Sequence, residues 1–351
     1  MMPTGSPSDP LDAGGVEPDI LGAPYTVERI LLPDDDEGPV EATLVRRPAD
    51  VVSTSSTTEA SSTTEASSTT EAKAGAVFHV HGFADYFFHT EYAEWWTARG
   101  YDFYAIDLRK YGRSLGEHQT PNYVADLREH FAELDEAWTR ITERDGHTRI
   151  VLSAHSTGGL IVPLWAKDRR PTQVVGLVLN SPWFDLRGSV MLRTVGTKVL
   201  DQLGARQPKR ILPRDVSGYY ARSLHQDHEG EWDFNLDWKP LLSWPVYAGW
   251  LRAVRRGHAE LQRGLGLTFP ALVLCSATTG APDEMDEVVH GTDIVLDVEQ
   301  IRRWAPALGG HVTIVSIEGA RHDTVLSLPP VRKQVYDEIG RWLGAYVTTA
   351  D

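Results

Sequence analysis

The stretch Arg149-Ile-Val-Leu-Ser-Ala-His-Ser-Thr-Gly-Gly-Leu-Ile-Val-Pro-Leu-Trp165 decides the fold. It begins as an apolar, β-rich run, reaches Ala154-His-Ser-Thr-Gly158 and continues as an apolar segment with the character of a buried helix. A strand, then small-x-Ser-x-Gly, then a helix is typical of a sharp turn that lifts a serine hydroxyl above a sheet edge. Ser156 is therefore our candidate nucleophile, and the backbone N–H of Thr157 is a candidate oxyanion donor. An ordinary Ser/Thr helix cap is the alternative interpretation.

Apolar strand patterns alternate with helical patterns on both sides of this stretch. We expect further strands at 25–32, 40–46, 76–81, 101–107, 174–179, 269–274 and 311–317, and further helices at 90–99, 122–144, 298–308 and 331–346. The later strands are apolar throughout, which indicates burial on both faces. The predicted fold class is therefore α/β, with a mostly parallel sheet flanked by helices.

Three segments interrupt this rhythm. Residues 1–22 are rich in Pro, Gly, Ser and Asp and indicate a flexible tail. Ser-Ser-Thr-Thr-Glu-Ala occurs three times within 53–74, and because the unit lacks large apolar residues we expect a surface loop there. Residues 184–265 contain several tryptophans and no convincing strand, which predicts a mostly helical insertion between two core segments, 23–183 and 266–351.

Acyl transfer by serine also needs a base, an acid that orients the base, and a second oxyanion donor. His322 directly follows the strand at 311–317, and Asp293 comes after the strand at 269–274. The N–H of Phe83, after His81-Gly82, is the candidate second donor. Each candidate follows the C-terminal end of a strand, where open α/β sheets bind their ligands.

Other carboxylates compete with Asp293 for the role of the acid. The segment 278–291 is acidic, so one of its carboxylates is an alternative. Asp185, soon after the strand at 174–179, is similar in position to the acid of some relatives with this kind of sheet, whereas Asp297 is the expected N-cap of the following helix.

Two further residue types have simple interpretations. His79 and His81 would share one face of a strand, but no third ligand follows at a metallohydrolase spacing, so we expect neither a metal nor a cofactor. His155, beside the candidate nucleophile, is expected to be structural. The single cysteine, Cys275, lies in an apolar run and is expected to be a small buried residue.

Five stretches together resemble the α/β-hydrolases of the monoacylglycerol lipase, lysophospholipase and serine aminopeptidase group. They are His81-Gly-Phe-Ala-Asp85, Asp107-Leu-Arg-Lys-Tyr-Gly-Arg-Ser114, Ala154-His-Ser-Thr-Gly158, Gly291-Thr-Asp293 and Glu318-Gly-Ala-Arg-His322. The resemblance runs from about residue 25 to 346 and implies an eight-stranded, mostly parallel sheet with a cap after strand six, where 184–265 falls. It also implies hydrolysis of a carboxylic ester with a hydrophobic part.

The chain departs from this pattern at Lys110, where the group usually has Gly, and at the insertion 278–291. The cap matches no substrate-defined member, so its aromatic residues Trp244, Tyr247 and Trp250 are the candidates for the substrate pocket. We expect a small, lipid-like ester as substrate. There are two alternatives. One is an aminopeptidase of the same fold, which would need an acidic anchor for the substrate amine. The other is a non-catalytic small-molecule receptor on this fold.

Composition excludes several other classes of protein. The net charge of −15 argues against nucleic-acid binding, which needs clustered Lys and Arg. One cysteine allows no intrachain disulfide, and no signal peptide or membrane-spanning run is evident, so we expect a cytoplasmic protein. A transient contact with a membrane surface and the oligomeric state stay open.

Overall fold

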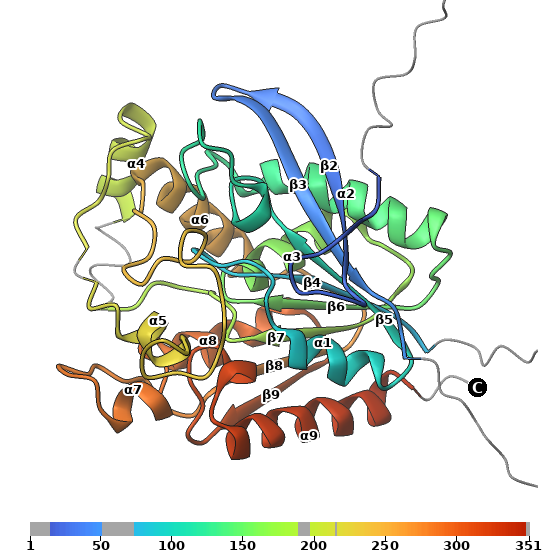
Figure 1. Cartoon of the computed structure of the whole chain (residues 1–351). Coiled ribbons are helices and arrows are strands. Elements are labelled where there is room, and N and C mark those ends of the chain that lie inside the picture. The colour runs from blue at the N-terminus through green and yellow to red at the C-terminus, as the bar shows by residue number, and fades with distance from the viewer. Residues whose placement is uncertain (1–14, 51–73, 189–196, 215, 349–351) are drawn as a thin grey trace, which may run out of the picture.

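A central sheet lies between two layers of helices (Figure 1). The computed structural model describes residues 15–50, 74–188, 197–214 and 216–348. Along the chain, the strands are β1 (Glu17–Pro18), β2 (Thr26–Asp35), β3 (Gly38–Arg47), β4 (Gly75–Val80), β5 (Tyr101–Asp107), β6 (Ile150–His155), β7 (Val174–Asn180), β8 (Ala271–Ser276) and β9 (Val312–Ile317). The order in the sheet is β1-β2-β3-β5-β4-β6-β7-β8-β9. Strands from β5 to β9 pair in parallel, and β1, β2 and β3 add antiparallel pairs. The predicted mostly parallel α/β sheet is confirmed, with β1 as a ninth, very short strand.

Alternate residues of each strand face opposite helical layers. In β4, Phe78 belongs to the core cluster that contains α2 (Phe131–Thr139), α3 (Gly158–Arg169) and α8 (Val298–Trp304). Its neighbour Val77 belongs to the cluster that contains α1 (Thr90–Thr97) and α9 (Pro329–Tyr346). Both clusters consist of buried apolar side chains, so the sheet is covered on both faces, as the apolar later strands predicted.

The helix expected at 122–144 begins later than predicted. Asp126 accepts a hydrogen bond from the Arg128 N–H and forms a capping box with Glu129, so a 3-10 turn starts at Leu127 and leads into α2. Asn122 has a left-handed backbone with φ of 59° and cannot continue a helix. The prediction was wrong for 122–126 because these residues follow the requirements of a neighbouring loop, described below.

The segment expected as a tail is partly ordered. Residues 1–14 lie outside the described residues, but β1 pairs with β2, and Asp19 forms a two-pronged ion pair with Arg113 at 2.8 and 2.9 Å. The expected tail of residues 1–22 is therefore too long. Local composition could not show this, because both contacts are with residues distant in the sequence. The three copies of the repeat, residues 55–72, lie outside the described residues, as does all of the expected loop 53–74 except residue 74.

The expected cap lies between β7 and β8 and carries α4 (Thr197–Arg206), α5 (Tyr219–Leu224) and α6 (Ala248–Leu261). α6 packs on α3 and places Trp250, Val254 and Leu261 in the main core cluster. We therefore count α6 with the core and reserve the name cap for residues 184–247. Among the described residues, no helix is long and apolar enough to cross a membrane.

Lys110, which replaces the usual glycine, connects the hairpin of β2 and β3 to the rest of the molecule. Its side chain is 2% exposed, and its ammonium group lies 2.6 Å from Asp35 and 2.7 Å from Glu37. A buried ammonium group needs such partners. Glu37 also binds Lys209 of the cap at 2.9 Å, so the hairpin tip contacts both the core and the cap.

Candidate active site

Ser156 occupies the turn between β6 and α3 in a left-handed conformation, with φ of 50°. A non-glycine residue rarely adopts this conformation, at a cost of about 1–2 kcal/mol, unless its surroundings enforce it. Two glycines make the turn fit. A Cβ atom at position 82 would lie 2.9 Å from the Cβ of Ser156, and one at position 158 would collide with the carbonyl oxygens of Val80 and His81. The small residues of the motif therefore serve close backbone packing, as expected.

Ser156, His322 and Asp293 form one continuous chain of hydrogen bonds. His322 Nε2 lies 3.1 Å from Ser156 Oγ, and His322 Nδ1 lies 2.9 Å from Asp293 Oδ2. The other carboxylate oxygen of Asp293 accepts the N–H groups of Val295 and Leu296 at 2.8 and 2.7 Å. If Nδ1 donates its proton to Asp293, Nε2 is free to accept the proton of the serine hydroxyl. This is the arrangement that an activated serine nucleophile requires.

Three of the carboxylates near Asp293 in the sequence have other partners. Within the insertion, Asp286 caps the short helix α7 (Glu287–Gly291) by accepting the N–H groups of two of its residues. Asp297 caps α8, as predicted. Asp185 pairs with Arg255. Asp293 itself is fully buried, and it is the carboxylate that His322 contacts.

The loop after β4 leaves the N–H group of Phe83 uncommitted. The N–H of Gly82 points at Asp85 Oδ2 at 3.4 Å, and the N–H of Ala84 donates to Asn122 Oδ1 at 3.0 Å. Within the described part of the chain, the N–H of Phe83 has no acceptor, and neither does that of Thr157. Both residues line the cavity at Ser156. The two expected oxyanion donors are thus brought to the same cavity as the serine.

Asn122 was missed by the sequence reasoning, which placed it in a helix. It is 1% exposed, its Oδ1 accepts from Ala84, and its Nδ2 donates to the carbonyl of Lys110 at 3.0 Å. Asn122 thereby ties the loop after β4 to the loop after β5. The signal available in the sequence was weak: a Pro-Asn pair before a helical pattern favours a turn.

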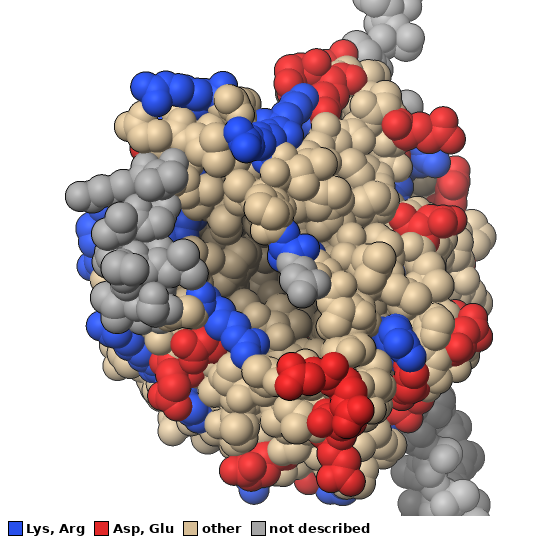
Figure 2. Space-filling model, turned by 90° about the vertical axis from the view of Figure 1, so that its left-hand side faces the viewer, with Lys and Arg blue, Asp and Glu red and all other residues tan. Residues whose placement is uncertain are grey.

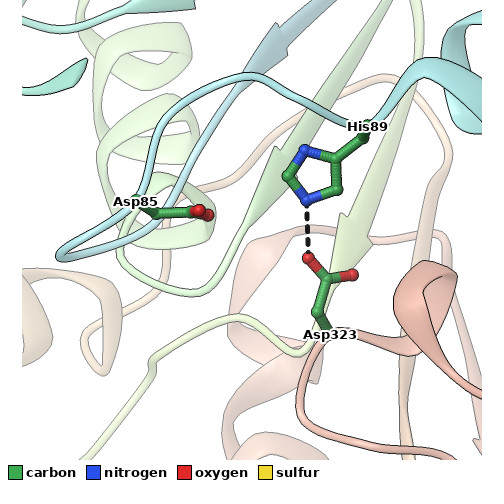
Figure 3. A group of neighbouring side chains, drawn as sticks. All are labelled: Asp85, His89 and Asp323. Carbon is green, nitrogen blue, oxygen red and sulfur yellow. Dashed lines mark hydrogen bonds and ion pairs between the residues drawn. The ribbon is translucent and has the colours of Figure 1, made fainter. Parts of the chain in front are cut away.

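A buried polar cluster lies behind His322. His89 Nε2 donates to Asp323 Oδ2 at 2.9 Å, and the carboxylate of Asp85 points toward this pair (Figure 3). Asp323 also accepts from Asn180 at 2.6 Å, and Asp85 forms an ion pair of 2.8 Å with Lys239 of the cap. Burial opposes ionisation of Asp323, but the neighbouring histidines and Asn180 hold its pKa well below the usual range.

One ligand atom from each of Asp85, His89 and Asp323 lies within 4.8 Å of the others, which is close enough to hold a metal ion. The donor set does not favour this role. An ammonium group already neutralises Asp85, and Asp323 receives hydrogen bonds from His89 and Asn180. The cluster is better described as a saturated hydrogen-bond network that joins the cap, the loop after β4 and the loop that carries His322.

The remaining histidines near the site have structural partners. His79 Nδ1 contacts Ser153 at 3.0 Å, whereas His81 Nε2 accepts the N–H of Leu108 at 3.0 Å. His155 donates to the carbonyl of Asn180, and burial lowers its pKa to about 4, so it is neutral at neutral pH. The side chain of Cys275 is buried, and burial raises its thiol pKa to about 11.

A cavity of about 360 Å³ opens at Ser156 and His322. Figure 2 shows a hollow on this face of the molecule, and the cap contributes much of the cavity lining. Of the three expected pocket residues, Trp250 lines the cavity, whereas Trp244 and Tyr247 do not. The indole of Trp244 donates to the carbonyl of Trp238, and the ring of Tyr247 packs on a tyrosine of the core. Trp183, which was not among the expected pocket residues, lines the cavity and packs against Trp250.

The geometry can now be compared with known proteins. A model of the family described as serine aminopeptidase, S33, matches residues 71–327, well over half of the chain. The chain belongs to this family. Its architecture is the α/β-hydrolase fold that the motifs predicted.

Two solved structures and one sequence relative illustrate what this chain is similar to. A soluble variant of the monoglyceride lipase of Saccharomyces cerevisiae, in complex with a substrate analogue, has a TM-score of 0.64 and 14% identity, covering 91% of this chain and 95% of that one. The monoacylglycerol lipase of Paleococcus ferrophilus has a TM-score of 0.55 and 22% identity, covering 78% and 95%. Phospholipase YtpA of Bacillus subtilis is 29% identical over 111 residues, which span 31% of this chain and 40% of that relative's length.

Proposed function

We propose that this protein hydrolyses carboxylic esters through an acyl-enzyme formed on Ser156. His322 takes the proton of Ser156 as Oγ attacks the ester carbonyl, and Asp293 stabilises the resulting imidazolium. The N–H groups of Phe83 and Thr157 stabilise the oxyanion, each contributing about 3–4 kcal/mol to lowering the barrier. His322 then protonates the departing alcohol, and water attacks the acyl-enzyme with His322 as the base.

The observation that carries this proposal is the unbroken path from Asp293 through His322 to Ser156, which ends at a cavity with two uncommitted N–H groups. Acyl transfer is the chemistry that uses a nucleophile, a base, an acid and an oxyanion site together.

The cavity supports a lipid-like substrate of modest size, of the monoacylglycerol or lysophospholipid type. Its volume lies at the small end of the range of about 300–1,000 Å³ that is usual for ligand sites. Many of the lining side chains are apolar, among them Trp183, Leu241, Val246, Trp250 and Leu296. The lipase and phospholipase names of the relatives agree with this substrate class.

The aminopeptidase alternative is disfavoured by the charge of the cavity. A free amine needs an unpaired carboxylate as its anchor. Among the described residues that line the cavity, the carboxylate is Asp85, and Lys239 already occupies it at 2.8 Å. A receptor without turnover would keep the same cavity, so activity distinguishes it from an enzyme.

The test is a panel of p-nitrophenyl esters, monoacylglycerols, lysophospholipids and aminoacyl p-nitroanilides, assayed with wild type and Ser156→Ala. Ester hydrolysis that is lost in Ser156→Ala supports the proposal. Hydrolysis of anilides but not esters would favour the aminopeptidase. Labelling of Ser156 by a fluorophosphonate without turnover of any ester would favour the receptor.

A further inference from the structure

The charges that line the cavity do not cancel. Asp85 and Lys239 neutralise each other, with side chains only 3% and 8% exposed. His155 is neutral at neutral pH, because burial lowers its pKa to about 4. The remaining charged side chain among the described lining residues is Arg214. The described lining thus carries a net positive charge in a protein whose overall charge is −15.

Arg214 has no carboxylate partner within the described part of the chain. Partial burial lowers the pKa of its guanidinium, and no carboxylate among the described residues raises it. Arg113 shows the opposite case, because Asp19 and Asp107 oppose the effect of burial and raise its pKa. Arg214 therefore bears a charge that the described residues leave uncompensated.

Arg214 lies at the mouth of the cavity. It contributes to the lining and yet remains solvent-exposed. Figure 2 shows Lys and Arg side chains at the rim of the hollow. The lining also includes the buried Trp250 and the half-buried Trp183 and Leu241, which offer an apolar surface. A ligand that matches this arrangement has an apolar body and one anionic group that stays near solvent.

We propose that Arg214 forms an anion-binding subsite at the cavity mouth, so that the preferred esters carry a phosphate or carboxylate group. A guanidinium binds either oxyanion through two parallel hydrogen bonds, whereas a neutral ester offers it no comparable partner. The inference rests on the proposed ester hydrolysis for its catalytic consequence, but the subsite itself binds anions whether or not turnover follows.

Turnover tests the subsite with matched ester pairs. One pair is p-nitrophenyl pentanoate and mono-p-nitrophenyl glutarate, which differ by a carboxylate on the acyl side. The other is monooctanoylglycerol and octanoyl lysophosphatidic acid, which differ by a phosphate on the alcohol side. For at least one pair, Arg214→Gln lowers the anionic-to-neutral ratio of kcat/KM by about tenfold or more, as expected for a lost charge-assisted hydrogen bond.

Two further variants sharpen the result. Arg214→Lys retains the charge but not the planar fork, so its ratio falls between those of wild type and Arg214→Gln. Arg210→Gln is the matched control, because Arg210 is exposed in the same segment, contacts Gln207 and does not line the cavity. An unchanged ratio in Arg214→Gln for both pairs, or an equal change in Arg210→Gln, overturns the proposal. The pair that responds shows on which side of the ester the anion lies.

Binding without turnover separates this proposal from the proposed activity. Octyl phosphate is titrated calorimetrically into Ser156→Ala, alone and combined with Arg214→Gln or Arg210→Gln. The subsite predicts that Arg214→Gln weakens binding by about tenfold or more and that Arg210→Gln does not. Equal affinity in all three proteins overturns the subsite, even if every ester is hydrolysed. Weaker binding to Arg214→Gln supports it, even if no ester is hydrolysed.

Discussion

Asn122 offers a sharp test of how the loop after β4 is held. In Asn122→Ala the N–H of Ala84 loses its acceptor in a buried position, which costs about 1–3 kcal/mol. The carbonyl of Lys110 keeps a partner, because the backbone N–H of residue 122 also donates to it at 3.0 Å. Alanine at a φ of 59° adds about 1 kcal/mol of strain. The free energy of unfolding should therefore fall by roughly 2–4 kcal/mol, measured by urea denaturation.

The same change should lower kcat more than it raises KM. Ala84 is next to Phe83, whose N–H is the proposed oxyanion donor, so a loop that is no longer held misplaces this donor. Complete loss of such a donor costs about 100-fold or more in kcat, and we expect about 10- to 100-fold for a displaced one. Asn122→Gly is the control: it removes the side chain and also the backbone strain. It should recover about 1 kcal/mol of stability relative to Asn122→Ala without recovering kcat. Wild-type kcat in either variant would refute this role for Asn122.

Three further outcomes follow from the buried charges and the thiol. Asp85→Asn and Lys239→Met should each lower the free energy of unfolding by about 3–5 kcal/mol, because each leaves a buried partner unpaired. The double variant should lose much less than the sum of the two single losses. Additive losses in urea denaturation would contradict the pairing. Burial raises the pKa of Glu37, but hydrogen bonds from Lys110 and other donors outweigh this effect and hold the pKa below its usual range. The ionised Glu37 side chain therefore stabilises the fold above about pH 4.3, and this contribution is lost as the pH falls. The stability difference between wild type and Glu37→Gln should accordingly shrink in acid, and a pH-independent difference would be inconsistent with the ion pairs. Iodoacetamide at about pH 8 should leave Cys275 unmodified in the folded protein and alkylate it in urea, because the thiol is buried and burial raises its pKa to about 11. Rapid labelling of the folded protein would contradict this burial.

The sheet and the candidate site were predictable because they depend on short patterns. Each strand that leads into Ser156 or His322 is a compact apolar run, and the small residues around Ser156 reflect a steric need within a few positions of the chain. The choice of Asp293 over the neighbouring carboxylates also agrees with the geometry, since Asp286 is occupied in capping a helix.

Features that depend on partners far apart in the sequence could not be predicted. Asn122 adopts a left-handed conformation because a loop 38 residues earlier needs its side-chain oxygen. Lys239 is buried because Asp85, 154 residues earlier, neutralises it. The helical pattern after Asn122 would look the same without Ala84 as a partner, and Lys239 would be equally basic without Asp85. The local sequence therefore indicates neither contact.

The pocket was only partly predictable for the same reason. An aromatic residue between β7 and β8 can line the cavity, as Trp250 of α6 does, or support the fold, as Trp244 and Tyr247 of the cap do. Composition alone does not distinguish these orientations. The direction of each ring is set by the contacts that its segment makes in the folded protein.

The most direct test of the central claim is to find the covalent intermediate. The folded protein is reacted with a fluorophosphonate and, separately, quenched in acid during turnover of a p-nitrophenyl ester, and the adducts are mapped by peptide mass spectrometry. We predict one adduct of each reagent, both on Ser156, and none in Ser156→Ala, which should also lose ester hydrolysis. An adduct on another residue, or wild-type hydrolysis by Ser156→Ala, would contradict Ser156 as the nucleophile.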